Sequence, residues 1–160
     1  MTKRAWVVMM AAYISGVALP AQTPLTLEAV QGLWRLESLK MDDKPTPSTG
    51  YLAIEGNHFL FITNLGRPKG TAEITAKNPS EWTDADKMTL IEAYNSMTAS
   101  AGTVAIKGDQ MFYSQEVTKV PHLKGRNEGR KAWFENGRLI QEFTAAGVVR
   151  NMVWARVPKK

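Results

Sequence analysis

Residues 130–144 read RKAWFENGRLIQEFT, which is two runs of strand-forming residues joined by Asn136-Gly137. Asn-Gly accepts the positive φ angles of a type I′ turn, whose twist suits a pair of antiparallel strands. This turn fixes the register and places Lys131 opposite Glu142. Because opposite charges then face each other, we expect this side of the hairpin to face solvent.

The other side of the same hairpin is mostly apolar and is predicted to face inward. A polar side chain on an inner face needs a hydrogen-bonding partner, so two members of this set are candidates for a function. They are Arg130 and Gln141, and the full inward set is Arg130, Ala132, Phe134, Leu139, Gln141 and Phe143.

Further short runs of strand-forming residues, separated by turn residues, fill most of the chain after residue 22. Eight or nine strands at this spacing predict a single antiparallel β-barrel or a sandwich. The other predicted strands are residues 31–41, 51–55, 58–63, 71–76, 102–107, 110–117 and 148–157.

One segment, about residues 83–99, has a helical pattern instead. Its apolar residues recur every three positions, and Thr83 with Asp86 resembles a capping box. We expect one amphipathic helix that covers an end of the barrel, with an apolar face made of Met88, Ile91, Tyr94 and Met97.

The first 21 residues have the pattern of an export signal. Lys3 and Arg4 precede an uncharged apolar run over 5–18, and small residues follow it. The run is short for a membrane span, so we expect cleavage after Ala21, or after Ala18, rather than a retained anchor. The sequence therefore predicts a periplasmic or secreted protein with a barrel domain over 27–157.

Composition narrows the function. The chain has 20 Lys and Arg against 15 Asp and Glu, and removal of the signal leaves 18 against 15, or +3. This mixed charge argues against a nucleic-acid partner. The chain has no cysteine, so thiol catalysis and thiolate metal sites are excluded, and its two histidines show no metal-ligand spacing. We expect no metal and no cofactor.

Several motifs occur in an order that resembles the bacterial lipocalin-like domain family. They are Gly32-Leu33-Trp34-Arg35-Leu36, Pro47-Ser48-Thr49-Gly50-Tyr51-Leu52, Pro121-x3-Gly125-x4-Arg130 and Gly137-x-Leu139. The resemblance covers residues 27–157 and implies a small barrel with a central cavity. It also implies that Arg156 packs over the indole of Trp34, next to Gly32, and closes one end, because a cation is attracted to a π face.

The predicted function is the binding of a small apolar or amphipathic molecule in the barrel. Arg130, Gln141 and Tyr113 would orient its polar end. The candidate wall residues are aromatic: Tyr51, Phe59, Phe61, Tyr94, Phe134 and Phe143.

Two alternatives stay open. The first is an isomerase or cyclase that uses His122 or Tyr113 as an acid or base. The second is an envelope protein with a filled barrel, whose basic stretch around His122 contacts anionic envelope components. The sequence leaves open a monomer or a weak dimer through Trp133 and Ile140, the identity of the ligand, and whether the barrel is open or filled.

Overall fold

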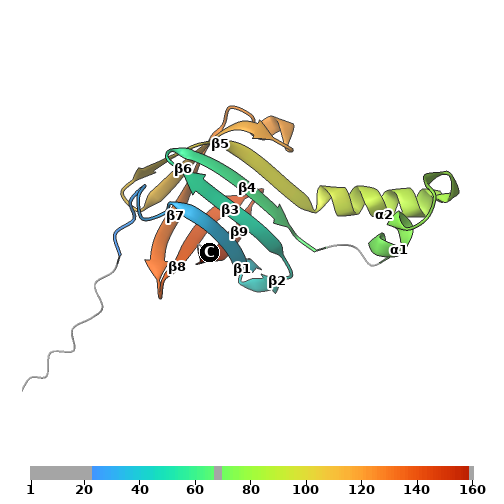
Figure 1. Ribbon diagram of the computed structural model, residues 1–160, viewed down its shortest axis with the longest axis horizontal. Helices are drawn as coiled ribbons and strands as arrows, with labels where there is room; N and C mark the ends of the chain where they lie inside the picture. Colours follow the sequence, from blue (N-terminus) through green and yellow to red (C-terminus); the bar gives the residue numbers. More distant parts are fainter. Residues whose placement is uncertain (1–22, 67–69, 159–160) are drawn as a thin grey trace, which may run out of the picture.

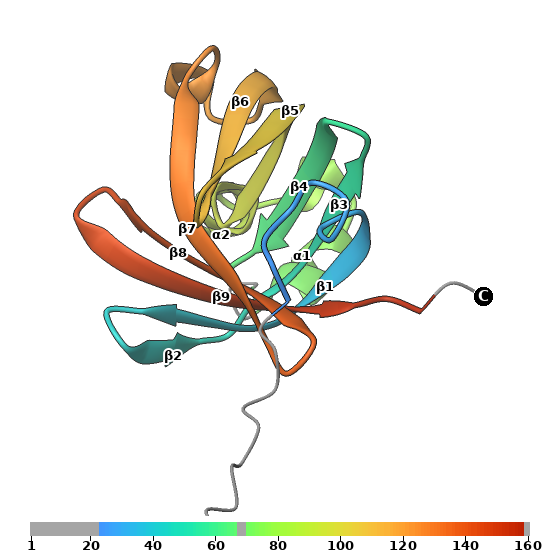
Figure 2. The same ribbon diagram turned by 90° about the vertical axis from the view of Figure 1, so that its left-hand side faces the viewer.

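The computed structural model describes residues 23–66 and 70–158, and most of them form β-strands (Figures 1 and 2). The predictions of an export signal and its cleavage site lie outside these residues. No helix within them is long and apolar enough to cross a membrane. The strands are β1 (Gly32–Met41), β2 (Lys44–Thr46), β3 (Thr49–Glu55), β4 (His58–Asn64), β5 (Met97–Lys107), β6 (Gln110–Thr118), β7 (Asn127–Glu135), β8 (Arg138–Ala145) and β9 (Val148–Arg156).

The strands form a closed antiparallel barrel. Their order around the sheet is β1-β3-β4-β5-β6-β7-β8-β9, and β9 pairs back with β1. The ninth strand, β2, pairs with the last residues of β1. Closure leaves few unpaired edges, and the strands follow one another around the sheet as in an up-and-down barrel. The predicted fold class is confirmed, although β2 was not expected.

The hairpin of β7 and β8 has the predicted register. Asn136 and Gly137 adopt φ angles of 50° and 74°, as a type I′ turn requires, and Lys131 lies opposite Glu142. The six residues predicted to face inward are buried or partly buried against the core. Ile140, on the outer side, is nevertheless buried at 5% exposure, so this outer apolar surface is smaller than expected.

One end of the barrel is sealed by an aromatic ring and a cation. Trp34 is fully buried and its Nε1 donates to the carbonyl of Val30, 2.8 Å away. The guanidinium of Arg156 lies 4.2 Å from the centroid of the indole ring and also donates to the carbonyls of Ala29 and Gln31. This is the contact that the resemblance implies.

A helical arm lies between β4 and β5, and its secondary structure differs from the prediction in two ways. Residues 71–76, predicted as a strand, form the short helix α1 (Thr71–Thr75), with a 3₁₀ turn (Pro79–Glu81) after it. Helix α2 (Asp84–Asn95) begins with the predicted capping box of Thr83 and Asp86 but ends before β5.

The arm does not cover the barrel, and that expectation was wrong. Figure 1 shows α1 and α2 together at one end of the molecule, away from the barrel body. Three apolar side chains of α2 are exposed, namely Met88, Ile91 and Tyr94. Because the helix packs on little besides α1, its predicted apolar face has no barrel surface to cover.

Candidate functional site

The barrel is filled at one end and hollow at the other. Large side chains fill the end sealed by Trp34, including Leu52, Phe134, Leu139 and Trp154, which are all buried. The opposite end contains a cavity of about 630 Å³. A cavity of this size falls within the range that small-molecule sites occupy. The barrel is therefore filled by side chains at one end and open at the other.

The cavity has an apolar wall and a polar wall. Leu39 on β1, Phe143 on β8 and Met152 on β9 belong to the first. Ser100 on β5 and Gln115 on β6 belong to the second. The alternation of each strand places these residues inside, and their strand order places the polar residues together. Such a cavity suits a molecule with both apolar and polar parts.

Arg130 lies at the inner end of the cavity and is 7% exposed. Three aromatic rings surround its guanidinium carbon, with centroids at 4.2 Å for Phe143, 4.7 Å for Tyr113 and 5.0 Å for Phe61. The negative faces of such rings replace part of the hydration that a buried cation loses. The buried Nε of Arg130 has no hydrogen-bond partner in the described part of the chain.

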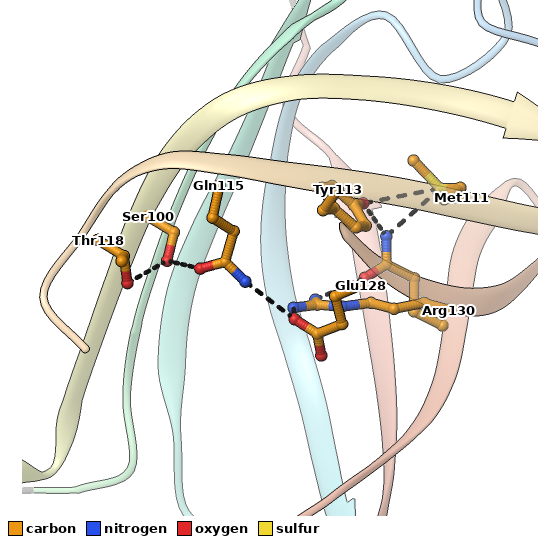
Figure 3. A network of polar contacts seen from close by, with 8 residues as sticks. Ser100, Met111, Tyr113, Gln115, Thr118, Glu128 and Arg130 are labelled. Carbon is orange, nitrogen blue, oxygen red and sulfur yellow. Dashed lines mark hydrogen bonds and ion pairs between the residues drawn. The ribbon is translucent and has the colours of Figure 1, made fainter. Parts of the chain in front are cut away.

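Arg130 also makes directional polar contacts (Figure 3). Its Nη2 lies 3.3 Å from a carboxylate oxygen of Glu128, two residues earlier on β7, and its Nη1 donates to Oε1 of Gln141 at 3.3 Å. The amide of Gln141 in turn donates to the hydroxyl of Tyr113 at 2.6 Å. The two inward polar residues of the hairpin are therefore partners of each other.

Tyr113 lies behind Arg130 and does not line the cavity. Burial raises the pKa of its hydroxyl to about 12, although the nearby charge of Arg130 acts in the opposite direction. A phenol with this pKa stays protonated at neutral pH. Tyr113 therefore stabilises the polar layer as a neutral hydroxyl and is poorly suited to act as a base.

From Glu128 the polar contacts continue toward the open end. Gln115 donates to the carboxylate of Glu128 at 3.1 Å, and Ser100 donates to the side-chain amide oxygen Oε1 of Gln115 at 2.8 Å. Thr118 lies 3.1 Å from the hydroxyl of Ser100 and ends the series (Figure 3). Because each member has a partner inside the protein, this wall is pre-organised before any ligand arrives.

Arg150 is a cavity residue that the sequence analysis missed. It lies opposite Phe143 in the pairing of β8 with β9, and it lines the cavity. Its Nε is buried without a partner, and its guanidinium makes no hydrogen bond or ion pair with any described residue. The signal for it was the alternation along β9, in which Arg150 and Met152 share a side with the buried Trp154.

The predicted wall residues separate into three groups. Arg130, Phe61 and Phe143 line the cavity, whereas Gln141, Phe59 and Phe134 are buried in the barrel but do not line it. Tyr51 and Tyr94 are 48% and 62% exposed, on the outside of the barrel and on the arm, and they take no part in the cavity.

His122 lies in a 3₁₀ turn (Pro121–Leu123) at the mouth of the cavity. Arg126 lies near it on the rim, and both are exposed. The two acid–base candidates predicted from the sequence therefore lie in different surroundings, since His122 is exposed at the mouth of the cavity and Tyr113 is buried. Within the described residues no group of three or more His, Asp or Glu side chains could hold a metal ion.

The sequence matches no protein-family model, and no curated protein matches it. Among solved structures, the crystal structure of a point mutant of the fluorescent protein UnaG is similar, with 14% identity and a TM-score of 0.38. The similarity covers 84% of this chain and all of that one. Similarity at this level carries no inference about a ligand or a mechanism.

Proposed function

We propose that this protein binds a small amphipathic molecule in the open end of its barrel. The observation that carries the proposal is a cavity of about 630 Å³ with an apolar wall and a pre-organised polar wall. Apolar walls remove water from the tail of a ligand, and a few fixed polar groups orient its other end. A barrel filled throughout by side chains would lack this space.

The test is a titration of the protein with a neutral fluorescent probe, N-phenyl-1-naphthylamine, whose binding is followed by its fluorescence. Native mass spectrometry of the purified protein accompanies it. We expect saturable binding at one site per chain. The variant Ala145→Trp, which places a large ring at a cavity-lining position of β8, should abolish binding. Val149→Trp, on an exposed position of β9, is the matched control and should bind normally. Equal binding by both variants would show that the probe lies elsewhere.

We further propose export to the periplasm or the medium and membership of the lipocalin-like domain family. Export is supported by residues 1–21 alone, with their positive start, apolar run and small residues. The family is supported by the order of its motifs. N-terminal sequencing of the protein after expression in a secreting bacterium tests export, and a mature chain that begins at Gln22 is the expected result. Retention of Met1 in the cell fraction would refute it.

A further inference from the structure

The proposed cavity contains two arginines in very different surroundings, and this difference indicates the chemistry of the ligand. Arg130 and Arg150 both lie on the inner side of the barrel, and Phe143 lies on the strand between theirs. Adjacent strands are about 4.8 Å apart, so the two backbones are separated by about 10 Å. Both guanidinium groups can therefore face the same cavity.

Arg130 has its charge compensated within the protein. It forms an ion pair with Glu128 and donates a hydrogen bond to Gln141. Three aromatic rings also pack around its guanidinium group. A ligand that sought this charge would have to compete with a carboxylate that is already in place. Arg130 therefore lines the inner end of the cavity but is not the residue that binds the charged part of a ligand.

Arg150 has no such compensation. No described residue provides it with a carboxylate or a carbonyl, although its Nε is buried. Arg150 is half-buried, and a partly desolvated charge without a partner is costly, so an anion that meets it gains a charge-assisted hydrogen bond at little additional desolvation cost.

The total charge of the cavity lining points the same way. Among the described residues that line it, Arg126, Arg130 and Arg150 are cations and Glu128 is an anion, which leaves an excess of two positive charges with His122 neutral. Charges that lie against the low-dielectric interior of a protein interact more strongly than charges in bulk water. The excess favours a ligand that brings negative charge.

We infer that Arg150 is an anion-binding residue, which takes the carboxylate or phosphate head group of an amphiphile whose tail packs on Leu39, Phe61 and Met152. This inference rests on the proposed function and specifies its ligand class. It also moves the head-group contact from Arg130, where the sequence placed it, to Arg150.

Three ligands with the same tail test the inference: dodecanoate, dodecyl phosphate and dodecanol, each used to displace the neutral probe. Because a hydrogen bond to a charged group is the difference, we expect the carboxylate to bind about tenfold or more tightly than the alcohol. Tighter binding of dodecyl phosphate than of dodecanoate would identify the head group as a phosphate, and the reverse order as a carboxylate.

Variants of the arginine make the test specific. In Arg150→Gln the preference for the anions over dodecanol should disappear while the affinity for dodecanol stays the same. Arg150→Lys keeps the charge and should keep part of the preference, which guards against a folding defect. Lys131→Gln removes a charge from an exposed position of β7 that does not line the cavity, and this control variant should keep the full preference.

The outcomes separate the two proposals. If neither the neutral probe nor dodecanol binds, the proposed function is refuted. If both bind but the anions show no preference, or if Arg150→Gln keeps the preference of the wild type, the cavity function stands and the role of Arg150 is overturned.

Discussion

Replacing Glu128 with glutamine removes the carboxylate that pairs with buried Arg130 and leaves a side chain of the same shape. At the 3.3 Å that separates Nη2 of Arg130 from Oε2, two unit charges attract by about 5 kcal/mol at an effective dielectric constant of about 20. The loss is smaller in practice, because Glu128 is 25% exposed and glutamine can still accept hydrogen bonds. We expect the free energy of unfolding to fall by about 1–3 kcal/mol.

Urea unfolding followed by tryptophan fluorescence measures this loss, which corresponds to a midpoint lower by roughly 0.5–2 M. Glu116→Gln is the matched control. It changes the net charge equally at an exposed position of β6, and it should unfold like the wild type. Equal midpoints for the two variants would refute the reasoning, because the charge of Arg130 would then depend on the aromatic rings rather than on Glu128.

The same substitution should act in the opposite direction on binding. Without Glu128 the cavity lining has one more uncompensated positive charge, so the affinity for dodecanoate should rise while the affinity for dodecanol is unchanged. A protein that becomes less stable but binds anions more tightly would show that the negative charge of Glu128 opposes anion binding in the cavity. An unchanged affinity for both ligands would separate Glu128 from the binding site.

Three further predictions concern the scaffold. A Cβ at Gly102 would lie 1.9 Å from the carbonyl oxygen of Ser114, so Gly102→Ala should cost about 3 kcal/mol or more, and a wild-type thermal midpoint would contradict this. The raised pKa of Tyr113 means that its contribution to stability is constant below pH 10 and is lost as the pH rises to about 12, because the unfolded phenol ionises first. Thermal midpoints across this range should fall less in Tyr113→Phe than in the wild type, and parallel curves would refute the assignment. Thr83→Ala removes the acceptor that caps Asp86, so circular dichroism should show less helix while the urea midpoint of the barrel is unchanged. A lower midpoint would show that the arm supports the barrel.

The parts of the fold that were predictable are those that local rules determine. Asn136-Gly137 specifies a turn, the turn specifies a register, and the register specifies which residues of β7 and β8 face inward. The start of α2 was equally local, since Thr83 and Asp86 satisfy each other within one turn.

The errors came from residues whose state depends on distant contacts. Thr71, Ile74 and Thr75 are β-branched and favour a strand, yet α1 forms because it packs against α2, and Trp82 donates to the carbonyl of Ile74. The direction of the arm is likewise determined by the positions at which β4 and β5 end. The helical pattern of residues 83–99 contains no information about it.

The site was predictable in its chemistry but not in its assignments. Arg130 and Gln141 were identified correctly as inward polar residues, but their mutual bond and the nearby carboxylate of Glu128 become visible only when β6, β7 and β8 are placed side by side. Arg150 was overlooked because a charged residue near a strand end usually faces solvent. The one feature that identifies Arg150 as an inward residue is the alternation along β9, which places it on the same side of the strand as the buried Trp154.

The division of the barrel into a sealed end and a hollow end has a consequence for how this protein can evolve. Trp34, Arg156 and the side chains around them carry the packing that folding requires, whereas the cavity wall near Thr98, Val120 and Ala145 carries little of it. Substitutions at the hollow end can therefore accumulate without crossing the threshold at which the chain unfolds. Descendants of one such scaffold could bind different ligands while the residues of their sealed ends stay nearly alike. Cavity residues should therefore be compared to infer the ligand, and residues of the sealed end to infer common ancestry.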